Sequence, residues 1–98
     1  MVHISFLTGS CVIFGAGGYG RTVADVARQS GKYGEILFLD DNSPVAVGKC
    51  ADYHKFISNE TEFYPAFGNN EGRVRFIDEI EGAGGKVATV IHSSAYVS

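Results

Sequence analysis

The hydrophobic residues in the first half of this chain form short apolar runs separated by a segment with helical spacing. Residues 11–14 (CVIF) are continuously apolar, as in a parallel strand that is covered on both faces. Residues 19–30 predict a helix, and Gly31 is placed to end it. The predicted apolar face of this helix consists of Tyr19, Val23, Val26 and Ala27. Residues 35–40 (EILFLD) then predict a second buried strand.

The second half repeats this alternation after an irregular segment. Residues 41–61 are rich in turn formers, and the stretch ADYHKFIS within them allows one or two helical turns. Residues 62–67 (EFYPAF) predict a third strand, although Pro65 removes a donor from the ladder. Residues 70–81 predict a helix that the following GAGG ends, and residues 86–91 (KVATVI) predict a fourth strand. The predicted apolar face of this second helix consists of Val74, Ile77 and Ile80.

This order of elements predicts an α/β fold, a small Rossmann-like parallel sheet with helices on both faces. Right-handed crossovers place the second strand on one side of the first and send the chain back to its other side, which gives the strand order 2-1-3-4. The reversal leaves a crevice at the carboxyl ends of the first and third strands, where open α/β sheets bind ligands. We expect one domain over residues 11–98, preceded by an N-terminal extension over residues 1–10.

A glycine-rich turn joins the first predicted strand to the first helix. Gly15, Gly17 and Gly20 match GxGxxG in this context, where the glycines allow a tight turn, close approach of a phosphate, and close helix packing. The helix N-terminus adds free N–H groups and a partial positive charge. Asp40, twenty residues past Gly20, ends the second strand where a carboxylate can accept hydrogen bonds from a ribose. The binding residues expected here are Gly15, Ala16, Gly17, Gly18, Tyr19, Gly20, Asp40 and Asp41.

The alternative interpretation of the glycine-rich turn is that its glycines only let a helix pack against a sheet, with Asp40 and Asp41 capping a turn.

The loop after the third strand would supply the second wall of a ligand site. Its candidate binding residues are Gly68, Asn69, Asn70 and Arg73. Asparagine amides both donate and accept hydrogen bonds, and an arginine can bind phosphate. One of the two asparagines is expected to cap the second helix.

Composition excludes several other classes of protein. The 98 residues, 45% apolar and with a formal net charge of −3, are those of one small globular domain without the basic face of a nucleic-acid module. Cys11 and Cys50 show neither metal-ligand spacing nor a disulfide framework, so we expect a reduced, cytoplasmic setting. The first twenty residues carry no Asp, Glu, Lys or Arg, but Gly, Ser and Thr interrupt them, and we expect neither a signal peptide nor a membrane span.

No catalytic constellation can be assembled from the remaining polar residues. Arg21 and Asp25, four residues apart, are expected to form a surface pair. His3, His54 and His92 are scattered, and none lies at a suggestive spacing from a carboxylate or a nucleophile. We therefore expect a binding domain without catalytic residues and without a metal site.

Four stretches of the sequence together resemble a known family. VIFGAGGYGRTVADVA, ILFLDDN, PAFGNNEGR and VATVIHSSAYVS occur in the order and spacing of the amino-terminal domain of bacterial sugar O- and N-acyltransferases. The resemblance is greatest to UDP-4-amino-sugar N-acetyltransferases and extends over residues 11–98. It implies that the domain binds a UDP-sugar and positions a sugar amine or hydroxyl for acetyl transfer.

The resemblance also implies parts that these residues do not contain. In the family, a carboxyl-terminal left-handed β-helix binds acetyl-CoA, supplies a histidine as general base and forms a homotrimer. We therefore expect no cofactor in this chain, and acetyl-CoA only for a longer enzyme. By motif, residues 15–20 would face the diphosphate, Asp40 and Asp41 the uridine, and Asn69, Asn70 and Arg73 the opposite wall. The family often has histidine in place of Tyr19, which leaves the sugar open.

Two further functions are compatible with the sequence. The first is an NAD-binding or redox-sensing domain, because GxGxxG followed by an acidic residue is common in dinucleotide-binding folds. Against it, four predicted strands are fewer than the two mononucleotide-binding halves of that fold require. The second is a regulatory module without a small ligand.

Overall fold

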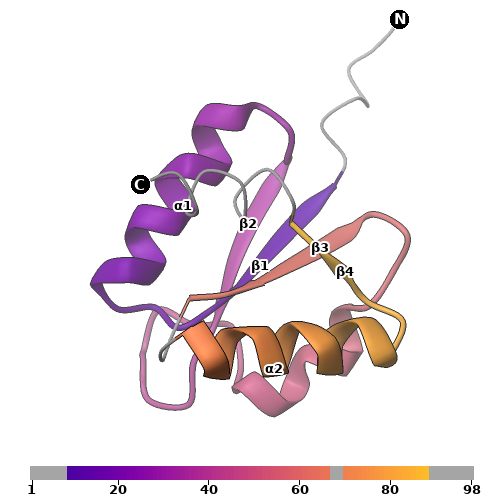
Figure 1. Cartoon of the computed structure of the whole chain (residues 1–98). Coiled ribbons are helices and arrows are strands. Elements are labelled where there is room, and N and C mark those ends of the chain that lie inside the picture. The colour runs from indigo at the N-terminus through magenta and orange to yellow at the C-terminus, as the bar shows by residue number, and fades with distance from the viewer. Residues whose placement is uncertain (1–8, 67–69, 89–98) are drawn as a thin grey trace, which may run out of the picture.

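The fold is a parallel four-stranded sheet between helices, as the computed structural model of the chain shows (Figure 1). The structure describes residues 9–66 and 70–88. The elements in chain order are β1 (Ser10–Phe14), α1 (Gly18–Ser30), β2 (Glu35–Leu39), the 3-10 helix η2 (Cys50–Phe56), β3 (Thr61–Pro65), α2 (Asn70–Gly82) and β4 (Lys86–Val87). The strand order is β2-β1-β3-β4 and the paired strands are parallel, so the predicted Rossmann-like topology is confirmed.

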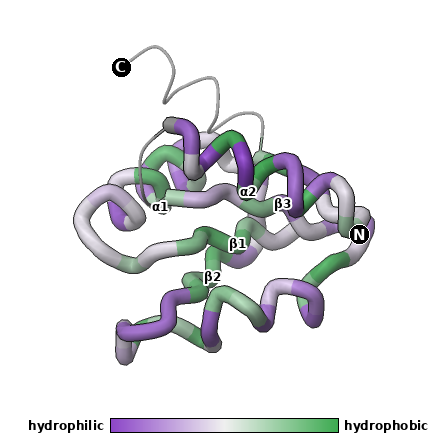
Figure 2. The backbone as a smooth tube through the Cα atoms, turned by 60° about the horizontal axis from the view of Figure 1, so that its bottom comes forward, coloured by the Kyte–Doolittle hydropathy of each residue, from purple (hydrophilic) through white to green (hydrophobic). Residues whose placement is uncertain are grey.

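The central strand β1 separates two hydrophobic cores. Alternate residues of a strand point to opposite faces, so Cys11 and Ile13 contribute to one core and Val12 and Phe14 to the other. α1 covers the first face, and α2 and η2 cover the second (Figure 1). In Figure 2, β1 is hydrophobic along its length, whereas the helices alternate between hydrophobic and hydrophilic segments.

Both helices end at glycines with left-handed backbone, as the sequence predicted. Gly31 has a φ of 67° and donates its N–H to the Arg28 carbonyl. Gly84 has a φ of 93° and donates to the Glu81 carbonyl, while Gly85 donates to the Ile80 carbonyl at 2.9 Å. These bonds satisfy carbonyl groups that the helix ends leave without intrahelical partners.

The predicted apolar faces of the helices were wrong at one residue each. The Tyr19 side chain is 41% exposed, and α1 instead buries Gly20, Val23, Ala24 and Ala27. On α2, Val74 is 56% exposed, while Ile80 is fully buried and Phe76 packs against the second core. Helical spacing therefore gave the phase of each face correctly but not the residue at its N-terminal end.

The prediction that residues 35–40 form a buried strand also needs correction, because β2 lies at the edge of the sheet and is only half-buried. A following segment covers part of its free edge. Val47 donates its N–H to the Phe38 carbonyl at 2.9 Å, and Asp40 donates to the Gly48 carbonyl at 3.0 Å. These bonds satisfy backbone groups that an open edge would expose.

Pro65 is the last residue of β3, so the strand ends two residues before the predicted boundary. It is fully buried and lies opposite Phe14 of β1. The next residue, Ala66, donates its N–H to the Phe14 carbonyl at 2.8 Å, which continues the pairing beyond the proline. A proline is tolerated in this interior strand because it stands at the terminus.

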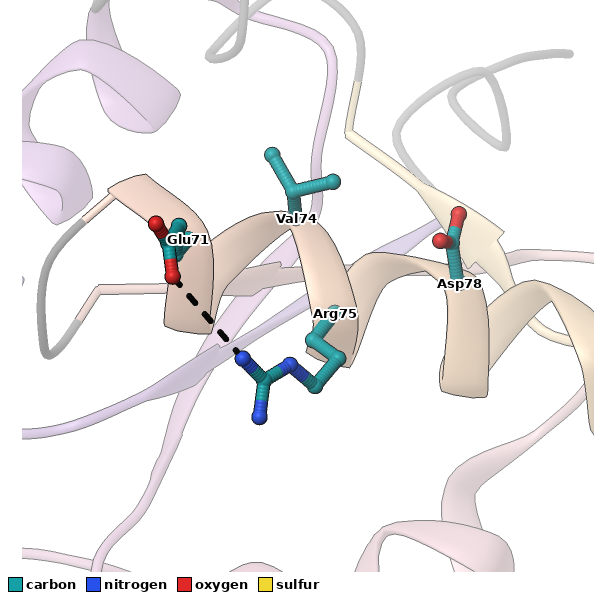
Figure 3. Close-up of a pocket in the computed structure, with 4 residues that line it drawn as sticks. All are labelled: Glu71, Val74, Arg75 and Asp78. Atoms are coloured by element: carbon teal, nitrogen blue, oxygen red, sulfur yellow. Dashed lines mark ion pairs between the residues drawn. The ribbon is translucent and has the colours of Figure 1, made fainter.

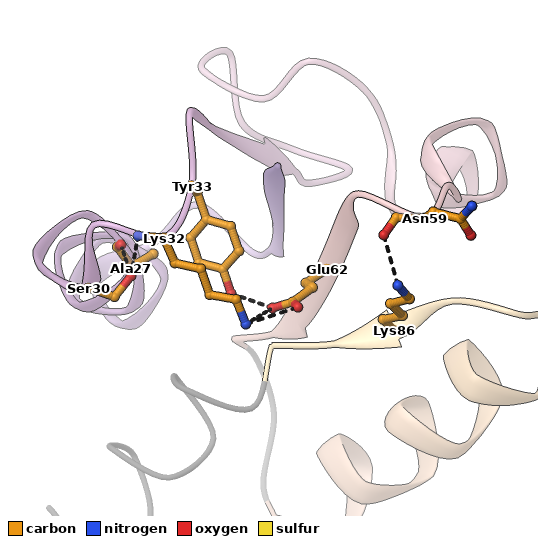
Figure 4. A network of polar contacts seen from close by, with 7 residues as sticks. All are labelled: Ala27, Ser30, Lys32, Tyr33, Asn59, Glu62 and Lys86. Carbon is orange, nitrogen blue, oxygen red and sulfur yellow. Dashed lines mark hydrogen bonds and ion pairs between the residues drawn. The ribbon is translucent and has the colours of Figure 1, made fainter. Parts of the chain in front are cut away.

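Two groups of polar residues lie away from the carboxyl ends of the strands. The predicted pair of Arg21 with Asp25 was wrong, because Asp25 pairs with Arg28 at 2.6 Å instead. At the amino ends of the strands, Glu62 accepts a hydrogen bond from the Tyr33 hydroxyl at 2.6 Å and pairs with Lys32 at 3.1 Å (Figure 4). This network joins the segment before β2 to β3.

Candidate functional site

The turn between β1 and α1 is fixed by its first and last glycines. Gly15 has a φ of 96°, which side chains rarely adopt, and its N–H donates to the Leu39 carbonyl of β2 at 2.8 Å. At Gly20, a built Cβ atom would lie only 1.9 Å from the Gly15 carbonyl oxygen. The chain therefore needs glycine at both positions, one for backbone conformation and one for close packing.

The middle of the turn has a different character. Gly17 has an extended backbone with a φ of −78°, which any residue can adopt. Apart from the chain neighbours and the nearby backbone of α1, no described atom lies within 4 Å of a Cβ built at Gly17 or Gly18. Geometry and packing within the described structure thus give no reason for glycine at these two positions, whereas close approach of a ligand to the backbone would.

The N-terminus of α1 has no side-chain cap. Gly17 precedes the helix, has no side chain and makes no side-chain cap, and no acidic residue lies in the first turn. Four N–H groups at the start of an α-helix have no intrahelical partner, and the helix dipole favours an anion beside them. The turn can therefore hold a phosphate group through backbone donors alone.

Asp40 connects this turn to the end of β2. One oxygen of its carboxylate accepts the Ala16 N–H at 2.8 Å, and the other accepts the Asn42 N–H at 2.8 Å. These two bonds, that from Ala16 first, hold the pKa of Asp40 below its usual value. In this arrangement the carboxylate fastens the glycine turn to the neighbouring strand.

Asp41, like Asp40, accepts a hydrogen bond from a backbone N–H group. Its Oδ1 accepts the Cys50 N–H at 3.0 Å, which links the end of β2 to the start of η2. Burial, followed by the charges of Asp41 and Asp40, raises the pKa of the Cys50 thiol. Both aspartates therefore make the turn-capping bonds of the alternative interpretation, and contact of either one with a nucleotide stays a prediction.

Arg73 connects the start of α2, the expected second wall of the site, with the glycine turn. The start of α2 and the turn before α1 lie at the same end of the sheet (Figure 1). The Arg73 guanidinium lies over the Tyr19 ring, 5.5 Å from its centroid. The Tyr19 hydroxyl is hydrogen-bonded to that of Tyr64, a buried residue of β3. Burial and this hydrogen bond raise the pKa of Tyr64 to about 12.

The structure thus unites most of the described candidates at the switch point between β1 and β3. Gly15, Gly17, Tyr19 and Arg73 lie around the carboxyl ends of these strands, with Asp40 on the β2 side. Gly68 and Asn69 lie outside the described residues, and Asn70 is described only as the first residue of α2. The expected capping asparagine is therefore untested.

Tyr64 is the one member of this group that the sequence reasoning missed. It lies in the predicted third strand, one residue before Pro65. A tyrosine near the carboxyl end of an interior strand at a switch point is a signal that could have identified it.

Other chemistry is sparse in the described part of the chain. Residues 9–66 and 70–88 contain no group of three or more His, Cys, Asp or Glu side chains that could hold a metal ion. Burial, with a smaller contribution from Glu62, raises the pKa of the Cys11 thiol to about 12. Among the described residues, those that line the hollow drawn in Figure 3 are exposed side chains of α2.

Taken together, the parallel sheet, its switch point and the open glycine turn define an α/β domain of the Rossmann-like class. The model of the family described as PglD N-terminal domain matches residues 10–80. The chain belongs to this family.

Two solved structures of an acetyltransferase domain have a similar fold. The acetyltransferase domain of PglB from Neisseria gonorrhoeae FA1090 is 30% identical with a TM-score of 0.74, over 83% of this chain and 43% of that one. The same domain in complex with acetyl coenzyme A is 31% identical with a TM-score of 0.66, over 78% of this chain and 40% of that one. The chain therefore spans less than half of the length of the proteins it matches.

None of the helices in the described segments has the length and apolar character needed to cross a membrane.

Proposed function

We propose that this chain is the nucleotide-sugar-binding domain of an acetyl-CoA-dependent sugar acyltransferase. The observation that carries the proposal is the glycine turn, which leaves room around Gly17 and Gly18 at the uncapped N-terminus of α1. A pyrophosphate is the ligand group that best suits such a turn, because it brings negative charge and many acceptor oxygens to backbone donors. Membership of the PglD N-terminal domain family favours a UDP-sugar over other nucleotides.

The role of the domain would be to position the sugar. Holding a sugar by its nucleotide aims the amine or hydroxyl at an acyl donor, and fixed geometry lowers the barrier to a bimolecular step. The acyl donor would be acetyl-CoA, since the similar domain of PglB forms a complex with acetyl coenzyme A. We propose that a carboxyl-terminal left-handed β-helix in a longer protein supplies its binding site, the base and trimer contacts, and that the protein acts in the cytoplasm.

Thermal unfolding of the 98-residue chain with UDP, UDP-sugars and NAD at equal concentrations tests this proposal. A ligand at a hundred times its Kd should add about 2.7 kcal/mol to the free energy of unfolding. We expect UDP and UDP-sugars to raise Tm and NAD to have little effect. Stabilisation by NAD and not by UDP would instead assign a dinucleotide-binding domain, and no response to any nucleotide would favour a module without a small ligand.

The variant Gly17→Leu tests whether the glycine turn is the site. A leucine there fits the backbone and meets no described atom at its Cβ, but its side chain would cover the amides that we assign to the phosphates. We expect its Tm without ligand to stay close to wild type and its response to UDP to disappear. Gly82→Leu is a matched control, because Gly82 also has open space around its Cβ but lies at the far end of α2. An undiminished response to UDP in Gly17→Leu would contradict the assignment.

A further inference from the structure

Tyr19 and Arg73 make a cation–π contact at the switch point. These residues belong to helices on opposite faces of the sheet, and the guanidinium lies over the phenol ring at its carboxyl end. Tyr19 is also hydrogen-bonded to the buried Tyr64, which fixes the ring to β3. A surface tyrosine with both contacts is held in one orientation, and it holds the arginine in turn.

Arg73 brings a positive charge to the glycine turn. It lies in the first turn of α2, and its guanidinium contacts Tyr19 in the first turn of α1, a turn that contains no acidic residue. A ligand with negative charge on adjacent groups can therefore contact the backbone N–H groups at the start of α1 and this cation together. The ring face of Tyr19 partly compensates Arg73, because its quadrupole attracts a cation.

We infer that Tyr19 is a positioning residue that holds Arg73 for the second phosphate of a diphosphate, while the glycine turn holds the first. The inference rests on the proposed function, because it concerns the same site. It assigns a specificity: a nucleoside diphosphate or inorganic pyrophosphate should bind more tightly than a nucleoside monophosphate. Arg73 would contact the ligand, whereas Tyr19 would act through Arg73.

Titration calorimetry of the full chain with UDP, UMP and inorganic pyrophosphate tests this inference in wild type and four variants. The variant Arg73→Gln removes the cation, and we expect about tenfold weaker binding of UDP and pyrophosphate, with UMP little changed. Arg75→Gln is the matched control, because it removes the same charge from the same helix at an exposed residue that pairs with Glu71. It should leave all three affinities unchanged.

The tyrosine variants separate positioning from a purely structural role. Tyr19→Leu should weaken UDP and pyrophosphate binding by about threefold, whereas Tyr19→Phe keeps the ring face and should retain most of the affinity. Nuclear magnetic resonance gives a readout without ligand, because the ring current of Tyr19 shifts the side-chain N–H signal of Arg73. That shift should persist in Tyr19→Phe and disappear in Tyr19→Leu.

The outcomes distinguish this inference from the proposed function. If wild type binds pyrophosphate but not UDP, and Tyr19→Leu weakens pyrophosphate binding, the positioning role stands and the nucleotide-sugar assignment fails. If UDP binds wild type and Tyr19→Leu equally well, or if Tyr19→Leu weakens UDP and UMP to the same degree, the positioning role is overturned while nucleotide binding stands. If neither UDP nor pyrophosphate binds, both are overturned.

Discussion

Replacement of Gly20 by alanine tests how firmly α1 is packed against the glycine turn. The added Cβ would lie 1.9 Å from the Gly15 carbonyl oxygen, whereas ordinary contact begins at 3.4 Å, so the start of the helix must move by about 1.5 Å. The obstacle is backbone, which cannot rotate away, and the same helix presents Val23, Ala24 and Ala27 to the core. Overpacking of this kind costs about 1–3 kcal/mol, and we expect the upper end of that range. For a domain of this size, Tm should then fall by about 10–20 °C.

Thermal and urea unfolding followed by circular dichroism measure this effect, with Gly18→Ala as the control. Gly18 is the first residue of α1 and has open space around its Cβ among the described atoms. Alanine is a better helix former than glycine by up to about 1 kcal/mol, so the control should be at least as stable as wild type. Equal stability of Gly20→Ala and wild type would refute the close approach of the helix to the turn.

Three further predictions concern the helix face, the aspartate at the turn and the two thiols. In urea titrations, Ile80→Ala should lower the free energy of unfolding by about 2–5 kcal/mol and Val74→Ala by less than about 0.5 kcal/mol, because of the two only Ile80 is buried. Similar losses in the two variants would contradict the corrected face of α2. Since the pKa of Asp40 is lowered in the folded protein, its contribution to stability is present above the usual value of 3.8 and is lost as pH falls through the folded pKa. Urea midpoints should therefore fall more steeply on acidification in wild type than in Asp40→Asn, and parallel profiles would count against the bonds to Ala16 and Asn42. In labelling with a thiol reagent at neutral pH, the half-buried Cys50 should react first, and the buried Cys11 should react only on unfolding. Simultaneous reaction of the two thiols would contradict their different burial.

Much of this fold could be predicted from local sequence because its elements and their ends are set by local physical rules. The apolar run at residues 11–14 had to be an interior strand, and glycines at 31 and 84 ended the helices through a backbone conformation that other residues rarely adopt. Chirality of the crossovers then reduced the strand orders to one, which the structure confirms. Spacing alone also selected Gly15 and Gly20, whose conformation and packing agree with the roles expected of them.

Tertiary structure decided which side chains meet, because contacts between distant segments leave no local pattern. Helical spacing placed Tyr19 and Val74 on apolar faces, but in the folded chain both side chains are exposed. The sequence marked Tyr19 and Arg73 as separate candidates, and only the arrangement of α1 and α2 around the end of β3 brought the cation over the ring. Likewise, the position of Asp40 after β2 made it a candidate from the sequence. Its hydrogen bond to the Ala16 N–H, however, forms only because β1 and β2 lie side by side in the sheet.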